Sequence, residues 1–216
     1  IYRDLAGQYK LTGRYREALA IFQELYSLDY NDQLDTRYEI LSLYVILSDF
    51  PKAKSFFNSR EDFGEDGAMV LLYLVAALMA GEEEIAEDLF EELLATIDGF
   101  EYLAVQRDFP FDEVQQVALH SAYMPGTVSE IYWAFFAIFP VTLVAGPYIQ
   151  GFFNSFIDIG EIFRQMGTVL VSTSLKAQVT DYLKTIGITT LEELSQLTEE
   201  EFLAIKGVGL KVLDMI

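Results

Sequence analysis

The stretch GRYREALAIF at residues 13–22 recurs in altered form as SDFPKAKSFF at residues 48–57 and as GEEEIAEDLF at residues 81–90. The three stretches begin at 13, 48 and 81, which places them 35 and 33 residues apart. Each opens on a turn-forming residue and carries alanine at its sixth position and phenylalanine at its tenth. A period near 34 with this pattern is typical of stacked helix-turn-helix pairs. We therefore predict an all-α chain.

An apolar helical pattern precedes each stretch, so each repeat should contain two helices joined by the turn. The alanines let the two helices approach closely, and the phenylalanines fill the space between neighbouring pairs. This pattern resembles the tetratricopeptide repeat family. The resemblance implies three helix-turn-helix repeats over residues 1–110, about the minimum for a stable stack.

In the tetratricopeptide family, the first helices of the repeats form a concave surface that binds peptides or partner helices. Carried over position by position, the resemblance implies a concave wall made of Arg3, Gly7, Lys10, Tyr38, Ser42, Val45, Ile46, Leu71, Val75, Leu78 and Met79. This wall is polar in the first repeat and apolar in the third. Because an exposed apolar wall is unusual, we expect an external partner or residues 131–153 to cover it.

The net charge of −20 limits the classes of partner. Acidic residues outnumber basic ones in residues 1–110, 111–171 and 172–216 alike. Nucleic acids are bound largely through lysine and arginine, so a basic protein partner is electrostatically favoured over DNA. The acids at 82–92 are interpreted as a solvated helix face. The chain has no cysteine, which excludes disulfides and thiol chemistry and suits a cytoplasmic protein.

Residues 131–157 contain no charged side chain and are long enough to span a bilayer. Pro140 and Pro147 argue against one spanning helix, because a proline inside a helix costs about 3 kcal/mol. No lysine or arginine cluster flanks the segment to orient it in a membrane. We therefore predict two or three short buried helices, separated at the prolines.

The first of these helices should begin at Thr127-x-x-Glu130, which has the pattern of a capping box. We expect residues 111–171 to form an apolar helical segment that packs on the repeat stack or extends it. Residues 131–153 are also rich in aromatic side chains, as homodimer interfaces are. A homodimer through 131–153 and a membrane-associated scaffold remain the alternatives for this segment.

Two turn signals divide the last part of the chain, at 187–190 and at Gly207-Val208-Gly209. Capping boxes at Thr190-x-x-Glu193 and Thr198-x-x-Glu201 mark two helix starts. The pattern is a helix-hairpin-helix, and residues 172–216 resemble the C-terminal domain of the bacterial RNA polymerase alpha subunit. The helical pattern runs to the last residue, so we expect this module to be truncated.

Helix-hairpin-helix modules bind DNA through backbone N–H groups of the hairpin and flanking lysines. The resemblance implies nucleic-acid contacts at Lys184, Lys206, Gly207, Gly209 and Lys211. The alpha-subunit family also uses an arginine, an asparagine and a serine, where this chain has Gln178, Asp181 and Val212. Glutamine at 178 in place of the arginine, and the acidic Asp181, weaken the attraction to the minor groove of DNA. A protein-contact role is therefore favoured over DNA binding.

No arrangement of residues points to catalysis. His120 is the one histidine, and without a second histidine or a cysteine it has no companion for a metal site. No phosphate-binding loop and no G-x-S-x-G element occurs. We expect a bacterial, cytoplasmic, non-enzymatic adaptor that uses no cofactor and no metal. The alternatives are a transcription-associated nucleic-acid-binding protein and a membrane-associated scaffold.

Overall fold

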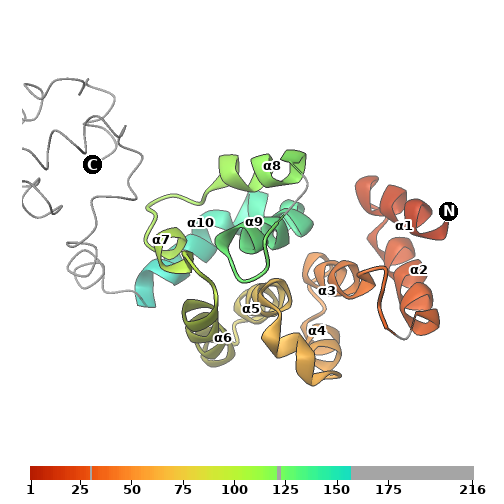
Figure 1. Ribbon diagram of the computed structural model, residues 1–216, viewed down its shortest axis with the longest axis horizontal. Coiled ribbons are helices and arrows are strands. Elements are labelled where there is room, and N and C mark those ends of the chain that lie inside the picture. Colours follow the sequence, from red (N-terminus) through yellow and green to blue (C-terminus); the bar gives the residue numbers. More distant parts are fainter. Residues whose placement is uncertain (30, 121–122, 157–216) are drawn as a thin grey trace, which may run out of the picture. The chain divides into compact units, whose positions relative to one another are not determined.

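The computed structural model describes residues 1–29, 31–120 and 123–156, and this part of the chain is all-helical, as predicted. Its secondary structure includes no β-strand; one isolated bridge joins Asp98 to Thr127. Figure 1 shows the order of the elements. They are α1 (Tyr2–Leu11), α2 (Tyr15–Leu28), α3 (Thr36–Ile46), α4 (Phe50–Phe57), η1 (Glu61–Glu65), α5 (Gly67–Ala80), α6 (Glu83–Thr96), α7 (Phe100–Ala104), α8 (Phe111–His120), α9 (Val128–Ala137) and α10 (Phe139–Phe156).

The first six α-helices form three consecutive hairpins, α1–α2, α3–α4 and α5–α6, which follow one another through space (Figure 1). Their turns share one backbone conformation. Gly13, Ser48 and Gly81 have φ values of 78°, 55° and 78°, in the left-handed region. In each turn the next N–H donates to a carbonyl five residues earlier, with N···O distances of 2.8, 2.9 and 3.0 Å. This is a Schellman-type helix end, repeated at equivalent positions.

The alanines and phenylalanines of the repeated stretches lie in the core. Ala18, Ala53 and Ala86 are buried where the two helices of each hairpin meet. The phenylalanines at the tenth position, Phe22, Phe57 and Phe90, are buried too. The repeated alanine and phenylalanine positions are therefore core positions in all three hairpins.

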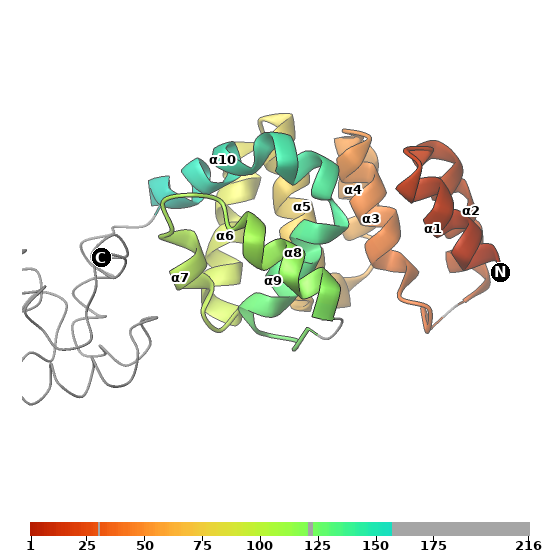
Figure 2. The same ribbon diagram turned by 90° about the horizontal axis from the view of Figure 1, so that it is seen from above.

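Helix α9 packs against α3 and α5, on the side away from α4 and α6 (Figure 1). Its buried residues are Glu130, Ile131, Ala134 and Phe135. The rings of Trp133 and Tyr38 pack edge to face, with their centroids 5.1 Å apart. Helix α10 contacts α3, α7 and α9 and runs along the rim of the helical body in Figure 2. Residues 131–156 of the uncharged segment thus belong to the same compact unit as the hairpins, which ends at Phe156.

The prediction that Pro147 interrupts this segment is wrong. A break does fall near Pro140, because α9 ends at Ala137 and α10 begins at Phe139, but α10 continues through Pro147. The proline ring is on the exposed face, while the opposite face is buried closely enough that a Cβ on Gly146 would come within 2.9 Å of the Phe109 ring. Packing on that face offsets the local cost of the proline.

Gln150 joins α10 to the end of α7. Its buried Nε2 donates to the carbonyl oxygens of Leu103, Ala104 and Gln106, at 3.1, 3.2 and 2.9 Å. The last carbonyls of a helix lack partners within it, and this side chain satisfies them for α7. Of the helices that the structure describes, none is long and apolar enough to cross a membrane.

The predicted helix-hairpin-helix module, residues 172–216, lies outside the described residues, as does the rest of the predicted 111–171 segment beyond Phe156. His120 is the last residue of α8.

Candidate functional site

A cleft of about 370 Å³ opens where the N-terminal ends of α3 and α5 face the segment that leads into α9. Among its lining residues are five carboxylates and one cation: Asp35, Asp62, Glu65, Asp66, Glu130 and Arg37. Tyr38 and Tyr123 add aromatic surface. The described residues contain no group of three or more histidine, cysteine or acidic side chains placed to hold a metal ion. We call this hollow the acidic cleft.

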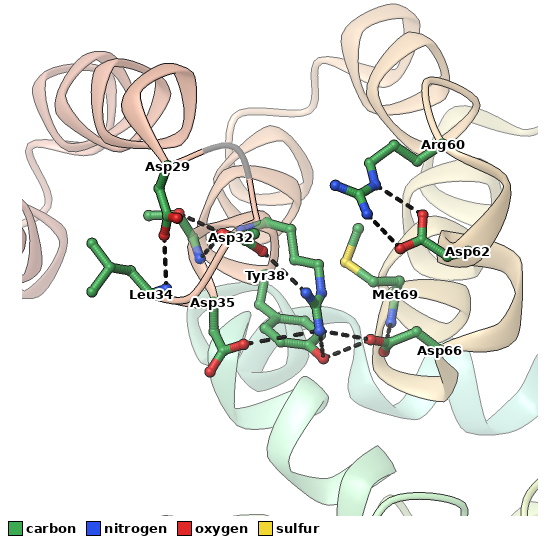
Figure 3. A network of polar contacts seen from close by, with 11 residues as sticks. Asp29, Asp32, Leu34, Asp35, Tyr38, Arg60, Asp62, Asp66 and Met69 are labelled. Atoms are coloured by element: carbon green, nitrogen blue, oxygen red, sulfur yellow. Dashed lines mark hydrogen bonds and ion pairs between the residues drawn. The ribbon is translucent and has the colours of Figure 1, made fainter.

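The Arg37 side chain bridges two aspartates that bind the starts of two helices, Asp32 and Asp66, both labelled in Figure 3. Asp32 lies three residues before the N-cap of α3, Asp35, and its Oδ1 accepts from the Thr36 N–H at 2.7 Å. Asp66 caps α5, with its Oδ1 accepting from the Met69 N–H at 3.1 Å. The two guanidinium nitrogens of Arg37 lie 3.2 Å from Asp32 Oδ2 and 3.4 Å from Asp66 Oδ2. The starts of α3 and α5 are therefore tied together through one cation.

Tyr38 completes this network. Its hydroxyl donates to Asp66 Oδ2 at 2.6 Å and accepts from Arg37 Nη2 at 2.8 Å. Burial, and then the hydrogen bond to Asp66, raises the pKa of the Tyr38 hydroxyl above its ordinary value. Burial by itself lowers the pKa of Arg37, but the Tyr38 hydroxyl and the carboxylates of Asp66 and Asp32 raise it overall. Arg37 thus stays charged, and its guanidinium forms ion pairs with carboxylates of the same chain.

Glu130 closes the floor of the cleft and is only 4% exposed. Its Oε1 accepts from the Ala68 N–H at 3.0 Å, and its Oε2 accepts from the Gly126 N–H at 2.8 Å. Burial raises the pKa of Glu130 above its ordinary value, although the two backbone N–H groups act against the rise. This carboxyl therefore holds the start of α9 onto the start of α5.

The predicted capping box at Thr127-x-x-Glu130 is only half correct. Thr127 does precede the first residue of α9, but its side chain makes no capping hydrogen bond. The Thr127 hydroxyl donates instead to the Met124 carbonyl at 2.8 Å. Glu130 accepts from the N–H of Gly126 in place of the expected Thr127 N–H, which donates to the Met124 carbonyl at 3.3 Å.

Most of the predicted concave wall is covered by the chain itself. Six of its residues are buried: Tyr38, Ser42, Val45, Leu71, Val75 and Leu78. Trp133 of α9 contacts Tyr38, and α9 packs along both α3 and α5, which carry these residues. The structure brings Tyr38 into the acidic cleft, but it buries Leu71, Val75 and Leu78 of the third repeat, which an external partner therefore cannot reach.

The remaining wall residues are more open. Arg3 and Met79 are exposed, whereas Gly7, Lys10 and Ile46 are half-buried. Lys10 Nζ donates to Ser42 Oγ at 2.9 Å and to Glu39 Oε2 at 2.7 Å, so this cation links α1 to α3. The accessible part of the wall is therefore limited to its two ends.

The predicted nucleic-acid contacts, Lys184, Lys206, Gly207, Gly209 and Lys211, lie outside the described residues. Sequence reasoning missed Arg37, Asp66 and Glu130 as cleft residues. Asp66 directly precedes the apolar run of α5, which is a recognisable capping signal, whereas nothing in the sequence pairs Arg37 with it. Comparisons with protein-family models, with curated proteins and with solved structures find no match to this chain.

Proposed function

We propose that this chain is a non-enzymatic adaptor, built on tetratricopeptide-like hairpins, that binds a segment of a partner protein. The repeated left-handed turns and the buried alanine and phenylalanine positions support a repeat origin for α1–α6. Helix α9 fills much of the surface that such a stack would present. The partner would therefore bind at the acidic cleft, which remains open beside the covered wall.

The charge of the acidic cleft favours a basic partner segment, and this is the observation that carries the proposal. Arg37 carries one positive charge shared among Asp32, Asp35 and Asp66, so the five carboxylates that line the cleft keep an excess of negative charge toward an incoming ligand. Asp35 and Glu65 are exposed at its mouth. A lysine or arginine side chain would be attracted by these carboxylates, while its methylene stem would lie against Tyr38 and Tyr123.

The proposal is tested by fluorescence anisotropy with the full chain and two labelled peptides of equal length, one rich in arginine and leucine, the other in glutamate and leucine. We expect binding of the basic peptide only, with an affinity that falls as salt increases. The double variant Asp35→Asn, Glu65→Gln should weaken binding about tenfold, or about 1.4 kcal/mol for two exposed charge pairs.

The matched control is Asp4→Asn, Glu24→Gln on the exposed sides of α1 and α2, which removes the same net charge in the first hairpin, where no residue lines the cleft. The control should leave the affinity within about twofold of the unaltered chain, because distant exposed charges are screened. Equal losses in the two double variants would assign binding to net charge and not to the cleft. Failure of the basic peptide to bind at low salt would refute the proposal.

A further inference from the structure

Helix α10 has an apolar face that the described helices leave uncovered. Its buried side consists of Thr142, Ala145, Gly146, Ile149, Gln150 and Phe153. We call the opposite side the α10 outer face. Its residues are all exposed: Pro140, Leu143, Val144, Pro147, Tyr148 and Gly151. These residues recur at intervals of three and four, so they form one stripe. The stripe contains no charged side chain.

The outer face holds both a protrusion and a hollow. Leu143 and Val144 project into solvent, with exposed fractions of 60% and 83%. A hollow of about 420 Å³ lies further along the helix, with Tyr148, Gly151 and Phe152 in its lining. A Cβ added at Gly151 would meet no atom within 4 Å, so the helix surface is open there. Val144 and Gly151 are two turns apart, or about 10 Å along the axis.

We propose that the α10 outer face is a homodimer interface, in which two copies of α10 cross antiparallel and Val144 of each copy enters the hollow beside Gly151 of the other. A two-fold axis requires each contact to occur twice, with the two residues exchanged. A protrusion and a hollow on one helix meet this requirement when the helices run in opposite directions. The face is thus complementary to itself.

Charge also selects a second copy as the occupant. Two chains of net charge −20 repel each other wherever carboxylates meet, and the α10 outer face is an uncharged surface through which they can approach. Glu83 at the border of the hollow is the one charged residue in its lining. Higher salt should therefore strengthen the dimer by screening repulsion, whereas it should weaken a basic peptide in the acidic cleft.

The exposed area indicates how stable the dimer should be. Applied to about 200 Å² for a large side chain, the exposed fractions of Leu143, Val144 and Tyr148 leave roughly 400 Å² of mostly apolar surface. Pro140, Pro147 and Gly151 add to it. A standard interface buries about 800 Å² per partner, so we expect a dimer with a dissociation constant on the order of micromolar.

The first test is sedimentation velocity of the full chain over a range of concentrations. We expect a monomer–dimer equilibrium that shifts toward the dimer at higher salt. Val144→Glu should weaken the dimer at least tenfold, because it brings two carboxylates into the interface. Leu28→Glu, at an equally exposed apolar site on α2, should leave the dissociation constant unchanged. A chain that stays monomeric, or a Val144→Glu variant with unaltered dimerisation, would overturn the proposal.

The second test reads the geometry directly, because the chain has no cysteine of its own. A mixture of the single variants Val144→Cys and Gly151→Cys should form a disulfide-linked heterodimer under mild oxidation. Each variant alone should cross-link poorly, since its two cysteines would be about 10 Å apart along the helices. Equal cross-linking in all three samples would overturn the antiparallel arrangement. Flotation of a monomeric chain with phosphatidylcholine vesicles would instead identify the face as membrane-binding.

Discussion

Replacing Ser48 by glycine should raise the free energy of unfolding by about 1 kcal/mol. Ser48 has a φ of 55°, and a left-handed backbone costs an ordinary residue about 1–2 kcal/mol. Glycine removes this strain. Its larger loss of backbone freedom on folding cancels about 0.5–1 kcal/mol of the gain. Ser48 is exposed, so no packing is lost. The equivalent turns already have glycine, at Gly13 and Gly81.

The reverse changes, Gly13→Ala and Gly81→Ala, should each lower the free energy of unfolding by about 1 kcal/mol. An added Cβ meets no atom within 4 Å at either site, so the loss reports backbone conformation alone. Gly7→Ala is the control: Gly7 lies inside α1, where alanine also meets nothing and should stabilise by up to about 1 kcal/mol.

Urea unfolding followed by fluorescence and circular dichroism measures all four variants. The chain's one tryptophan is Trp133 in α9, which packs on α3 and α5, so its fluorescence reports Ser48→Gly and Gly81→Ala. Circular dichroism, which follows every helix, adds the first hairpin, where Gly7 and Gly13 lie. The reasoning is refuted if Ser48→Gly lowers the urea midpoint, or if alanine at Gly13 and Gly81 costs nothing while the slope of the transition is unchanged.

Two further substitutions test the contacts that join α9 and α10 to the hairpins. Glu130→Gln should cost about 1–3 kcal/mol, because it turns an NH₂ group toward a backbone N–H of Ala68 or Gly126. Since the pKa of Glu130 is raised on folding, the unaltered chain loses stability as the pH rises from about 4.3 through that raised pKa. The cost of Glu130→Gln in urea titrations should therefore shrink from about pH 4 toward neutral pH; a growing cost would contradict this. Phe90→Ala should cost about 3–5 kcal/mol by calorimetry or urea, because the buried Phe90 ring packs 5.3 Å from that of Phe153. A loss below about 1 kcal/mol would show that α10 does not depend on this contact.

The hairpins could be predicted from sequence because their signals are local. A turn residue, an alanine and a phenylalanine at fixed spacing specify where two neighbouring helices end and touch, and Ser48 is in the left-handed position even without glycine. The path of α10 could not be predicted in the same way. Pro147 carries a known local cost, whereas the packing that offsets it involves Phe109, far away in sequence.

The candidate site shows the same division between local and distant contacts. Asp66 stands at the N-cap of α5 and is recognisable from sequence, whereas Asp32 binds the start of α3 from three residues before its N-cap. Their connection through Arg37 depends on how the second and third hairpins stack. The hydrogen bond between Glu130 and Ala68 joins residues 62 positions apart and holds the start of α9 on α5, beside the buried part of the wall.

The position of α9 has a consequence for cooperativity. In a simple repeat stack each hairpin touches only its neighbours, so the ends can open one unit at a time. Here α9 contacts α3 and α5 together, and the second and third hairpins cannot separate without releasing it. The first hairpin is held mainly through α2 and α3. Amide hydrogens of α3, α5 and α9 should therefore exchange in one slow step, and those of α1 and α2 in an earlier, independent one.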